Sequence, residues 1–343
     1  MIDAGTLEHA YKYTWSGFLG WEQRSHADNW VLLPDNLGPH LSIDESSLHD
    51  DLFTIVTNKD GHGRTGTVVA MVRGTKAEDV IKVLMQIPEE ERKKVKEVTM
   101  DLSESMRSII EAAFPDATIT LDCFHIMKRC LEAVEEFRLR YKREAQAEIN
   151  REMRRYKKRQ KRNADHRRWY ARTHPRKYKG KKRGRKARRK NEPFRPPVLS
   201  NGDTLVELLT RSKHALTQTH DKWSERQQAR MRLLFQMYPK LKELYDIVNK
   251  LRSIFRSKKL TRDEAKTKLH EWYQAVADCT IREIKSARDA IKSREDEVLN
   301  YFINRSTNAG AESLNSKMKS FRAQLRGVSD LPFFMFRLSK IFG

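Results

Sequence analysis

The sequence lacks the features typical of membrane, secreted and zinc-finger proteins. It has no run of 18 or more apolar residues and no apolar leader after Met1, so we expect a soluble chain with no membrane partner. Its three cysteines, Cys123, Cys130 and Cys279, form no CxxC pair and have no histidine at zinc-finger spacing. Disulfides and a structural zinc therefore both lack support, and a reducing cytoplasm fits the chain.

The positive charge of the chain is concentrated in one block. The net charge is +23, and residues 151–190 hold 22 Lys or Arg against two acidic residues. A block this dense repels itself, so we expect it to contact a polyanion, namely nucleic acid. Interleaved aromatic side chains, such as Trp169, offer flat faces for bases or sugars. The alternative is a solvated basic tail or a nuclear-localisation-like run. The candidate contacts are Lys157, Lys158, Arg159, Arg167, Arg168, Trp169, Lys181, Lys182, Arg183 and Arg185.

The first part of the chain predicts a short lead-in followed by three strands. Residues 1–39 are rich in aromatic side chains without strand alternation, and they end in a turn-forming stretch, so we expect a helix and a linker. Three short apolar runs follow at 41–44, 52–57 and 65–72, and the hairpin signal at 58–61 separates the second from the third. These runs predict an antiparallel meander.

The pattern then alternates between helix and strand. Residues 76–86 carry apolar side chains at helical spacing, residues 95–102 alternate, and Ser103 is the expected N-cap of a helix that stops at Pro115. A further strand at 117–121 leads into a long charged helix. The order β-β-β-α-β-α-β-α is the layout of the α/β ribonuclease-H-like fold, in which helices cover both faces of a mixed sheet.

Helical periodicity dominates the rest of the chain. We expect one or two helices over 306–340, with Ser306 or Thr307 as the cap and a junction at Pro332. The expected organisation is a lead-in at 1–39, a first part of the core at 40–126, a helical insertion with the basic block at 127–300, and C-terminal core helices at 301–343.

Two aspartates lie at the ends of strands that this fold places side by side. Asp44 closes the first apolar strand and Asp101 closes the fourth, so their carboxylates should face one another. Both lie beside apolar residues, where an unpaired carboxylate is expensive to desolvate and a bound cation offsets the cost. Alternatively, each aspartate caps the next turn or helix.

A third carboxylate is expected from the C-terminal helices. Glu312 lies early in the helix expected after residue 306, and Asn308, Asn315 and Lys319 fall on the same helical face. Divalent-metal phosphoryl chemistry needs several carboxylates converging on one point, and Glu312 would complete such a set. A glutamate early in a helix also has a simpler explanation, because it interacts favourably with the helix dipole.

Four segments of the chain carry a family resemblance. LSIDESS, VTMDLSESMRSII, ITLDCFHIMK and STNAGAESLNSKMKSFRAQLRG occur in this order. In this order and at these intervals they resemble the DDE transposases of the ISL3 group of bacterial insertion sequences, which are similar to Mutator-like and hAT transposases. The resemblance implies that Asp44, Asp101 and Glu312 are catalytic residues that hold two Mg²⁺ ions, with Mn²⁺ as a substitute. It also implies DNA cleavage at the element's ends and transfer of the 3′-hydroxyl into target DNA.

The same resemblance assigns supporting roles. Residues 122–125 match a C/D-x-x-H motif of the superfamily, so Asp122 and His125, together with Asn308 and Asn315, are expected to support the metal ligands or to position the DNA end. Two alternatives stay open: Asp122 as the second catalytic aspartate, and His125 as a buried structural histidine. Basic residues on or near the Glu312 helix are candidates for phosphate contact, or else form a solvated face: Lys317, Lys319, Arg322 and Arg326.

The resemblance also bears on partners and on rival functions. DNA is the expected substrate, and bringing two DNA ends together needs a homodimer or a larger assembly. Members of the group usually carry an N-terminal zinc-binding and helix-turn-helix region that this sequence lacks, so we expect a truncated copy or a separately encoded end-recognition protein. The expected location is the cytoplasm, at the nucleoid. The rivals are a ribonuclease-H-like nuclease that cuts without joining and an inactive DNA-binding transposase remnant.

Overall fold

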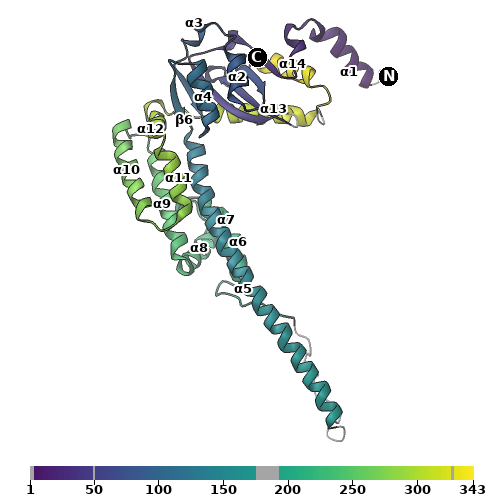
Figure 1. The fold of residues 1–343 in the computed structure, drawn as a ribbon, viewed down its shortest axis with the longest axis vertical. Coiled ribbons are helices and arrows are strands. Elements are labelled where there is room, and N and C mark those ends of the chain that lie inside the picture. Colours follow the sequence, from purple (N-terminus) through teal and green to yellow (C-terminus); the bar gives the residue numbers. More distant parts are fainter. Residues whose placement is uncertain (1–3, 49–50, 175–192, 326–327) are drawn as a thin grey trace. The chain divides into compact units, whose positions relative to one another are not determined.

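The chain divides into two compact units, which we describe separately (Figure 1). The computed structural model describes residues 4–48, 51–174, 193–325 and 328–343. The first unit, here called the sheet unit, comprises Met1–Arg129, Leu251–Ala275 and Arg288–Gly343. The second, here called the helical unit, comprises Cys130–Lys250 and Val276–Ala287.

A six-stranded mixed sheet forms the centre of the sheet unit, which confirms the predicted fold class. The strands lie in the order β1-β4-β3-β2-β5-β6. The pairs β1/β4, β4/β3 and β3/β2 are antiparallel, whereas β2/β5 and β5/β6 are parallel. Strands β2 and β5 are therefore neighbours, as the site prediction requires. The strands are β1 (Trp30–Leu32), β2 (His40–Ser47), β3 (Leu52–Asn58), β4 (Val68–Arg73), β5 (Glu97–Met100) and β6 (Thr118–Leu121).

Helices fill the two crossovers between parallel strands. The chain passes from β4 through α2 and α3 to β5, and from β5 through α4 to β6, as parallel pairing demands. Ser103 caps α4, because its side chain accepts a hydrogen bond from the backbone N–H of Met106; this confirms the predicted cap. The helices up to this point are α1 (Ala4–Ala10), α2 (Ala77–Leu84), α3 (Glu89–Arg92) and α4 (Glu104–Ala113).

Strand β1 was missed in the sequence, where residues 1–39 predicted only a helix and a linker. It lies at the edge of the sheet and pairs with β4, with Trp30 opposite Val72 and Leu32 opposite Ala70. The strand is only three residues long, so alternation over its length cannot be told from a loop. Its pairing with β4, rather than its own pattern, makes it a strand.

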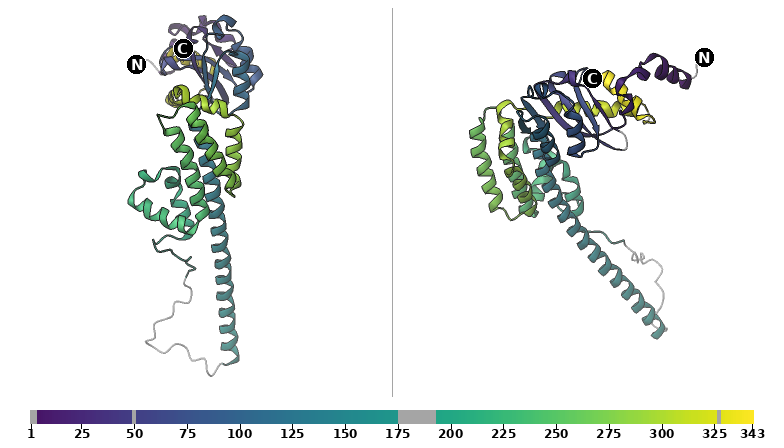
Figure 2. Two further views of the ribbon diagram at one scale, coloured as in Figure 1. Left: turned by 90° about the vertical axis from the view of Figure 1, so that its left-hand side faces the viewer. Right: turned by 45° about the horizontal axis from the view of Figure 1, so that its top comes forward.

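After β6, the named elements of the described residues are all helices. The longest, α5, has 51 residues, and its far end projects beyond the other helices of the helical unit in both views of Figure 2. No described helix combines the length and apolar composition needed to cross a membrane. These helices are α5 (Cys123–Thr173), α6 (Leu205–Arg211), α7 (Lys213–Thr217), α8 (Glu225–Met237), α9 (Pro239–Arg256), α10 (Arg262–Asp278), α11 (Arg282–Lys292), α12 (Glu295–Asn304), α13 (Ala309–Gln324) and α14 (Leu331–Phe342).

Helix α13 begins later than predicted. Its N-cap is Asn308, not Ser306 or Thr307, and the Asn308 side chain makes no capping hydrogen bond. Instead, its amide nitrogen lies 3.3 Å from the backbone oxygen of Ile43 in β2. The side chain therefore links the helix to the sheet. The predicted junction at Pro332 is confirmed, because Pro332 lies in the first turn of α14.

An apolar cluster holds α13 and α14 against the sheet. Phe53 and Ile55 of β3 belong to the same buried cluster as Leu314 and Met318 of α13 and Met335 of α14. All five are at most 1% exposed. Because this cluster joins helices from the end of the chain to strands from its beginning, it fixes where α13 lies on the sheet.

We expect Phe53→Ala to destabilise the sheet unit strongly. Removing a fully buried phenylalanine leaves a cavity, and the typical cost is about 3–5 kcal/mol of unfolding free energy. Leu52→Ala is the matched control, because Leu52 is 48% exposed and consecutive strand residues point to opposite faces. Urea denaturation of both variants would measure the difference, and equal losses would contradict this account of the core.

Candidate active site

Strand β2 presents Asp44 at a break in the sheet's hydrogen bonding. On one side Asp44 pairs with Ile55 of β3, but on the other side β2 pairs with β5 only over His40–Ser42. Asp44 therefore lies just past the point where the two parallel strands separate. The prediction that it closes its strand is wrong, because β2 stays paired with β3 as far as Ser47. Asp44 is 9% exposed. Its carboxylate accepts hydrogen bonds from the backbone N–H of Glu45 at 2.8 Å and from Asn315 Nδ2 at 2.7 Å.

Asp101 follows the last residue of β5, where the chain turns toward α4. Its Oδ2 lies 2.8 Å from His125 Nδ1, and its Oδ1 lies 3.5 Å from Asn308 Nδ2. The position at the carboxyl end of a parallel strand is the usual one for functional groups in open sheets. One carboxylate oxygen of Asp101 therefore contacts His125, and the other makes only a long contact with the Asn308 amide.

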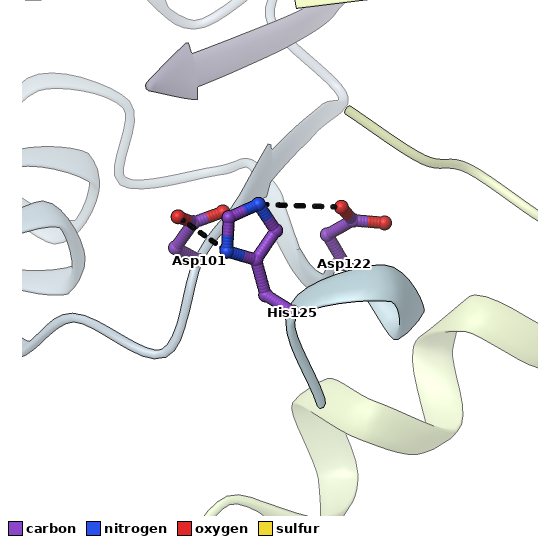
Figure 3. Close-up of side chains that lie close together, drawn as sticks. All are labelled: Asp101, Asp122 and His125. Carbon is purple, nitrogen blue, oxygen red and sulfur yellow. Dashed lines mark ion pairs between the residues drawn. The ribbon is translucent and has the colours of Figure 1, made fainter. Parts of the chain in front are cut away.

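Asp122 and His125 enter from the neighbouring strand and the helix that follows it. Asp122 comes directly after β6 and is 1% exposed, and its Oδ1 accepts a hydrogen bond from the backbone N–H of Phe124 at 3.3 Å. His125, in the first turn of α5, lies between the carboxylates of Asp101 and Asp122 (Figure 3), with its Nε2 3.9 Å from Asp122 Oδ2. One potential ligand atom from each of Asp101, Asp122 and His125 lies within 4.8 Å of the others.

Glu312 reaches the same histidine from α13. Its Oε1 lies 3.4 Å from His125 Nε2, and its side chain is 40% exposed. The imidazole therefore has Asp101 at one nitrogen and Glu312 at the other. Because Asn315 lies one turn beyond Glu312 on the same helix, α13 contacts both His125 and Asp44.

Burial and neighbouring charges shift the pKa values of two acidic residues and the histidine of this site. Burial raises the pKa of Asp44 to about 6, and the charges of Asp101 and Glu312 act in the same direction. Burial also raises the pKa of Asp122. The hydrogen bond to Asp101 raises the pKa of His125, as do the charges of Asp101, Asp122 and Asp44. Carboxylates thus outnumber the cations beside them, and the site favours added positive charge.

The donor atoms of the site fit a divalent cation. The amide oxygens of Asn308 and Asn315 are buried and have no hydrogen-bond partner among the described residues. Carboxylate and amide oxygens are the ligands that Mg²⁺ prefers, and a cation would offset the repulsion that raises the pKa of Asp44. The chemistry of these side chains therefore fits the divalent metal that the sequence predicts.

A comparison with known families decides the class of the protein. The family model for DDE transposases of the ISL3 group, described as Transposase, matches residues 41–338. The chain belongs to this family. Membership implies a phosphoryl-transfer enzyme that acts on DNA with a divalent metal, and it confirms the resemblance drawn from the four sequence segments. No curated protein and no solved structure matches the chain.

The structure of this transposase brings the predicted site residues of the sheet unit together. His125 contacts Asp101 and Glu312, and Asn315 contacts Asp44. Of the basic residues on α13, Lys317 donates a hydrogen bond to the backbone oxygen of Gly63 at 2.9 Å, so it also anchors a loop.

The predicted basic contacts fall partly outside the described residues. The exposed ones are Lys157, Lys158, Arg159, Arg167, Arg168 and Trp169 on α5, and Lys317 and Lys319 on α13, whereas Arg322 on α13 is partly buried. The ones outside the described residues are Lys181, Lys182, Arg183, Arg185 and Arg326.

Two further polar residues of the sheet unit were not predicted from the sequence. Burial and the charge of Asp101 raise the pKa of Glu45, although strand alternation places Glu45 on the opposite face from Asp44. Lys59 donates a hydrogen bond to Thr99 Oγ1, and its Nζ lies 3.7 Å from Oε1 of buried Glu97. The charge of Asp122 also acts on Lys59. In the sequence Lys59 is only part of a turn signal.

We expect Asn315→Ala to weaken divalent-metal binding by about 10- to 100-fold, the usual cost of losing a group that orients a metal ligand. The variant removes the amide that donates to Asp44 and leaves every carboxylate in place. Isothermal titration with Mn²⁺ measures the effect, after circular dichroism has confirmed folding.

Ser316→Ala is the matched control for this measurement. Ser316 is exposed on the same helix and donates only to the backbone oxygen of Glu312 in its own helix. Its Mn²⁺ affinity should equal that of the wild type. An Asn315→Ala variant that binds Mn²⁺ as tightly as the control would contradict the role of Asn315.

Proposed function

We propose that this transposase uses Asp44, Asp101 and Glu312 to hold two divalent metal ions, cleaves DNA at the ends of its insertion sequence and joins the freed 3′ ends to target DNA. The main support is that His125 links carboxylates from distant parts of the sequence, with Nδ1 2.8 Å from Asp101 and Nε2 3.4 Å from Glu312. The charges of Asp101 and Glu312 also act on Asp44.

Mg²⁺ is the proposed metal, with Mn²⁺ as a substitute, because the three proposed ligands are carboxylates. When bound, the metal would activate the attacking oxygen and stabilise the leaving oxygen of the phosphodiester. The protein's own contribution is to hold its ligands in place. Asn315 orients Asp44, and the Asn308 amide lies beside both Asp101 and the backbone of β2.

Asp122 and His125 are proposed as positioning residues for the metal ligands and the DNA end. The backbone N–H of Phe124 holds the Asp122 carboxylate, and Asp101 holds His125 through Nδ1. A hydrogen bond at Nδ1 fixes the orientation of the imidazole ring and leaves Nε2 directed at Glu312. Because the pKa of His125 is raised, the ring carries positive charge over a wider pH range, which suits a neighbour of phosphates.

The proposed DNA contacts are basic side chains in both units. Lys319 is exposed on α13 and lies seven residues after Glu312, a spacing that places both on the same helical face. The exposed cations of α5 are the second contact region. Since two DNA ends must be joined, we also propose that at least two copies of the chain act together, at the nucleoid.

We expect Asp101→Asn to abolish strand transfer while DNA binding persists. The substitution keeps the size of the side chain but removes one ligand charge. A loss of several kcal/mol of metal-derived stabilisation corresponds to about a thousandfold in rate. The assay would mix pre-cleaved element ends, a target plasmid and Mg²⁺, and count joined products on a gel.

Asp116→Asn is the matched control, because Asp116 is exposed in the turn before β6; it should join ends like the wild type. A wild-type protein that cuts both DNA ends and plasmid without joining them would favour the simple nuclease. DNA binding with no metal-dependent product, and no difference between wild type and Asp101→Asn, would favour the inactive remnant.

A further inference from the structure

The far part of α5 is densely positive over more than half of its circumference. This segment, residues 151–173 and here called distal α5, has eleven Lys or Arg and two acidic residues over 23 positions. None of its residues is buried. By contrast, Cys130, Val134 and Phe137 in the preceding part of the same helix are at most 2% exposed.

Apolar packing therefore contributes little to distal α5. Both views of Figure 2 show it extending past the other described helices of the helical unit. Tyr156 contacts Phe194, with ring centroids 5.7 Å apart, but the outward-facing positions are nearly all charged or polar. Most helical stability in proteins comes from packing an apolar face. The only such face of distal α5 is narrow and half-buried, and it holds Met153, Tyr156, Ala164 and Ala171.

Its own charges oppose the helical state. Like charges four residues apart are neighbours on a helix and destabilise it. Only a few acids offset them, as in the ion pairs Arg151–Glu148 and Arg168–Asp165. The repelling pairs are Arg151/Arg155, Arg154/Lys158, Arg155/Arg159, Lys157/Lys161, Lys158/Arg162 and Arg168/Arg172.

We propose that distal α5 is a DNA-dependent helix that lies in the major groove of a DNA duplex and needs the phosphates of both strands for its stability. Cations that spread over more than half of the helix circumference suit a groove with phosphates on both flanks, and the major groove admits an α-helix. Its 23 residues at about 1.5 Å each span about 34 Å, close to one turn of the duplex.

Duplex DNA fits this segment better than other nucleic acids do. Proteins bind single strands largely by stacking aromatic side chains on bases, and distal α5 has three aromatic residues, Tyr156, Trp169 and Tyr170, against eleven cations. The major groove of duplex RNA is too narrow for side chains to enter. This inference rests on the proposed function, because it specifies how the transposase holds its DNA.

Hydrogen exchange followed by mass spectrometry tests the inference on the full chain. The samples contain EDTA and a 24-base-pair DNA duplex, the matching single strand, a duplex RNA of equal length, or no nucleic acid. We expect duplex DNA to slow exchange in distal α5 about tenfold or more, with little change over residues 130–145. Equal protection without nucleic acid, or equal protection by the single strand or duplex RNA, would overturn the proposal.

Lys158→Glu separates helix stability from DNA binding. The new carboxylate lies three or four residues from Arg154, Arg155, Lys161 and Arg162, so four repulsive spacings become attractive. We expect exchange in distal α5 without DNA to slow about threefold or more. Duplex affinity should weaken, and the slope of log affinity against log salt should become shallower by about one unit, as one phosphate contact is lost.

Lys240→Glu is the matched control, because it makes the same charge change at an exposed position of α9 and should exchange like the wild type in distal α5. Faster exchange in Lys158→Glu than in the wild type without DNA would contradict the proposal. The measurement requires no catalysis. Protection by duplex DNA together with failed strand transfer would refute only the proposed function, whereas strand transfer without DNA-dependent protection would refute only this inference.

Discussion

The active site depends on an electrostatic constraint, because several carboxylates share a partly buried space that contains few cations. Moving a carboxylate away from water without a partner is costly, so the group tends to bind a proton instead. Asp44 follows this rule, since burial and the charges of its neighbours raise its pKa to about 6. The backbone N–H of Glu45 and the charge of His125 oppose the effect, and Asn315 of α13 donates a hydrogen bond to the same carboxylate.

Helix α13 fixes the positions of two polar side chains of this site. Leu314 and Met318 belong to the apolar cluster beneath it, and these side chains fix the rotation of the helix about its axis. Glu312 and Asn315 lie together on one side of that apolar stripe. The same packing that buries Leu314 therefore directs Asn315 toward Asp44 and Glu312 toward His125. Hydrophobic burial supplies the stability of this contact, whereas the polar groups determine which atoms meet.

The sequence was sufficient for the parts of the site that depend on strand order. The ribonuclease-H-like order expected from the sequence makes the strands of Asp44 and Asp101 neighbours, and hence predicts that the two carboxylates lie close together. The β2/β5 pairing confirms the strand order. The sequence could not predict β1, because three residues carry no usable period. It also placed the cap of α13 too early, since the Asn308 side chain bonds to Ile43 of β2 rather than to its own helix.

The contacts that depend on tertiary packing were beyond a reading of the sequence. Alternation along β2 places Glu45 on the opposite face from Asp44, yet burial and the charge of Asp101 both raise the pKa of Glu45. Lys59 reaches buried Glu97 through a long flexible side chain. The C/D-x-x-H motif identifies His125, but only the folded chain places its ring between two carboxylates. Motif spacing thus identifies which residues belong to the site, and packing determines which of their atoms are in contact.

The two units present opposite electrostatic problems. The carboxylates of the sheet unit repel one another and favour a cation, while the eleven cations of distal α5 repel one another and favour an anion. A DNA duplex with its associated Mg²⁺ provides both kinds of charge. In the proposed complex each binding event would remove a repulsion already present in the free protein, which would link ligand binding to local stability in both units. If both proposals hold, the free chain is less stable at these two places than the same chain on its substrate.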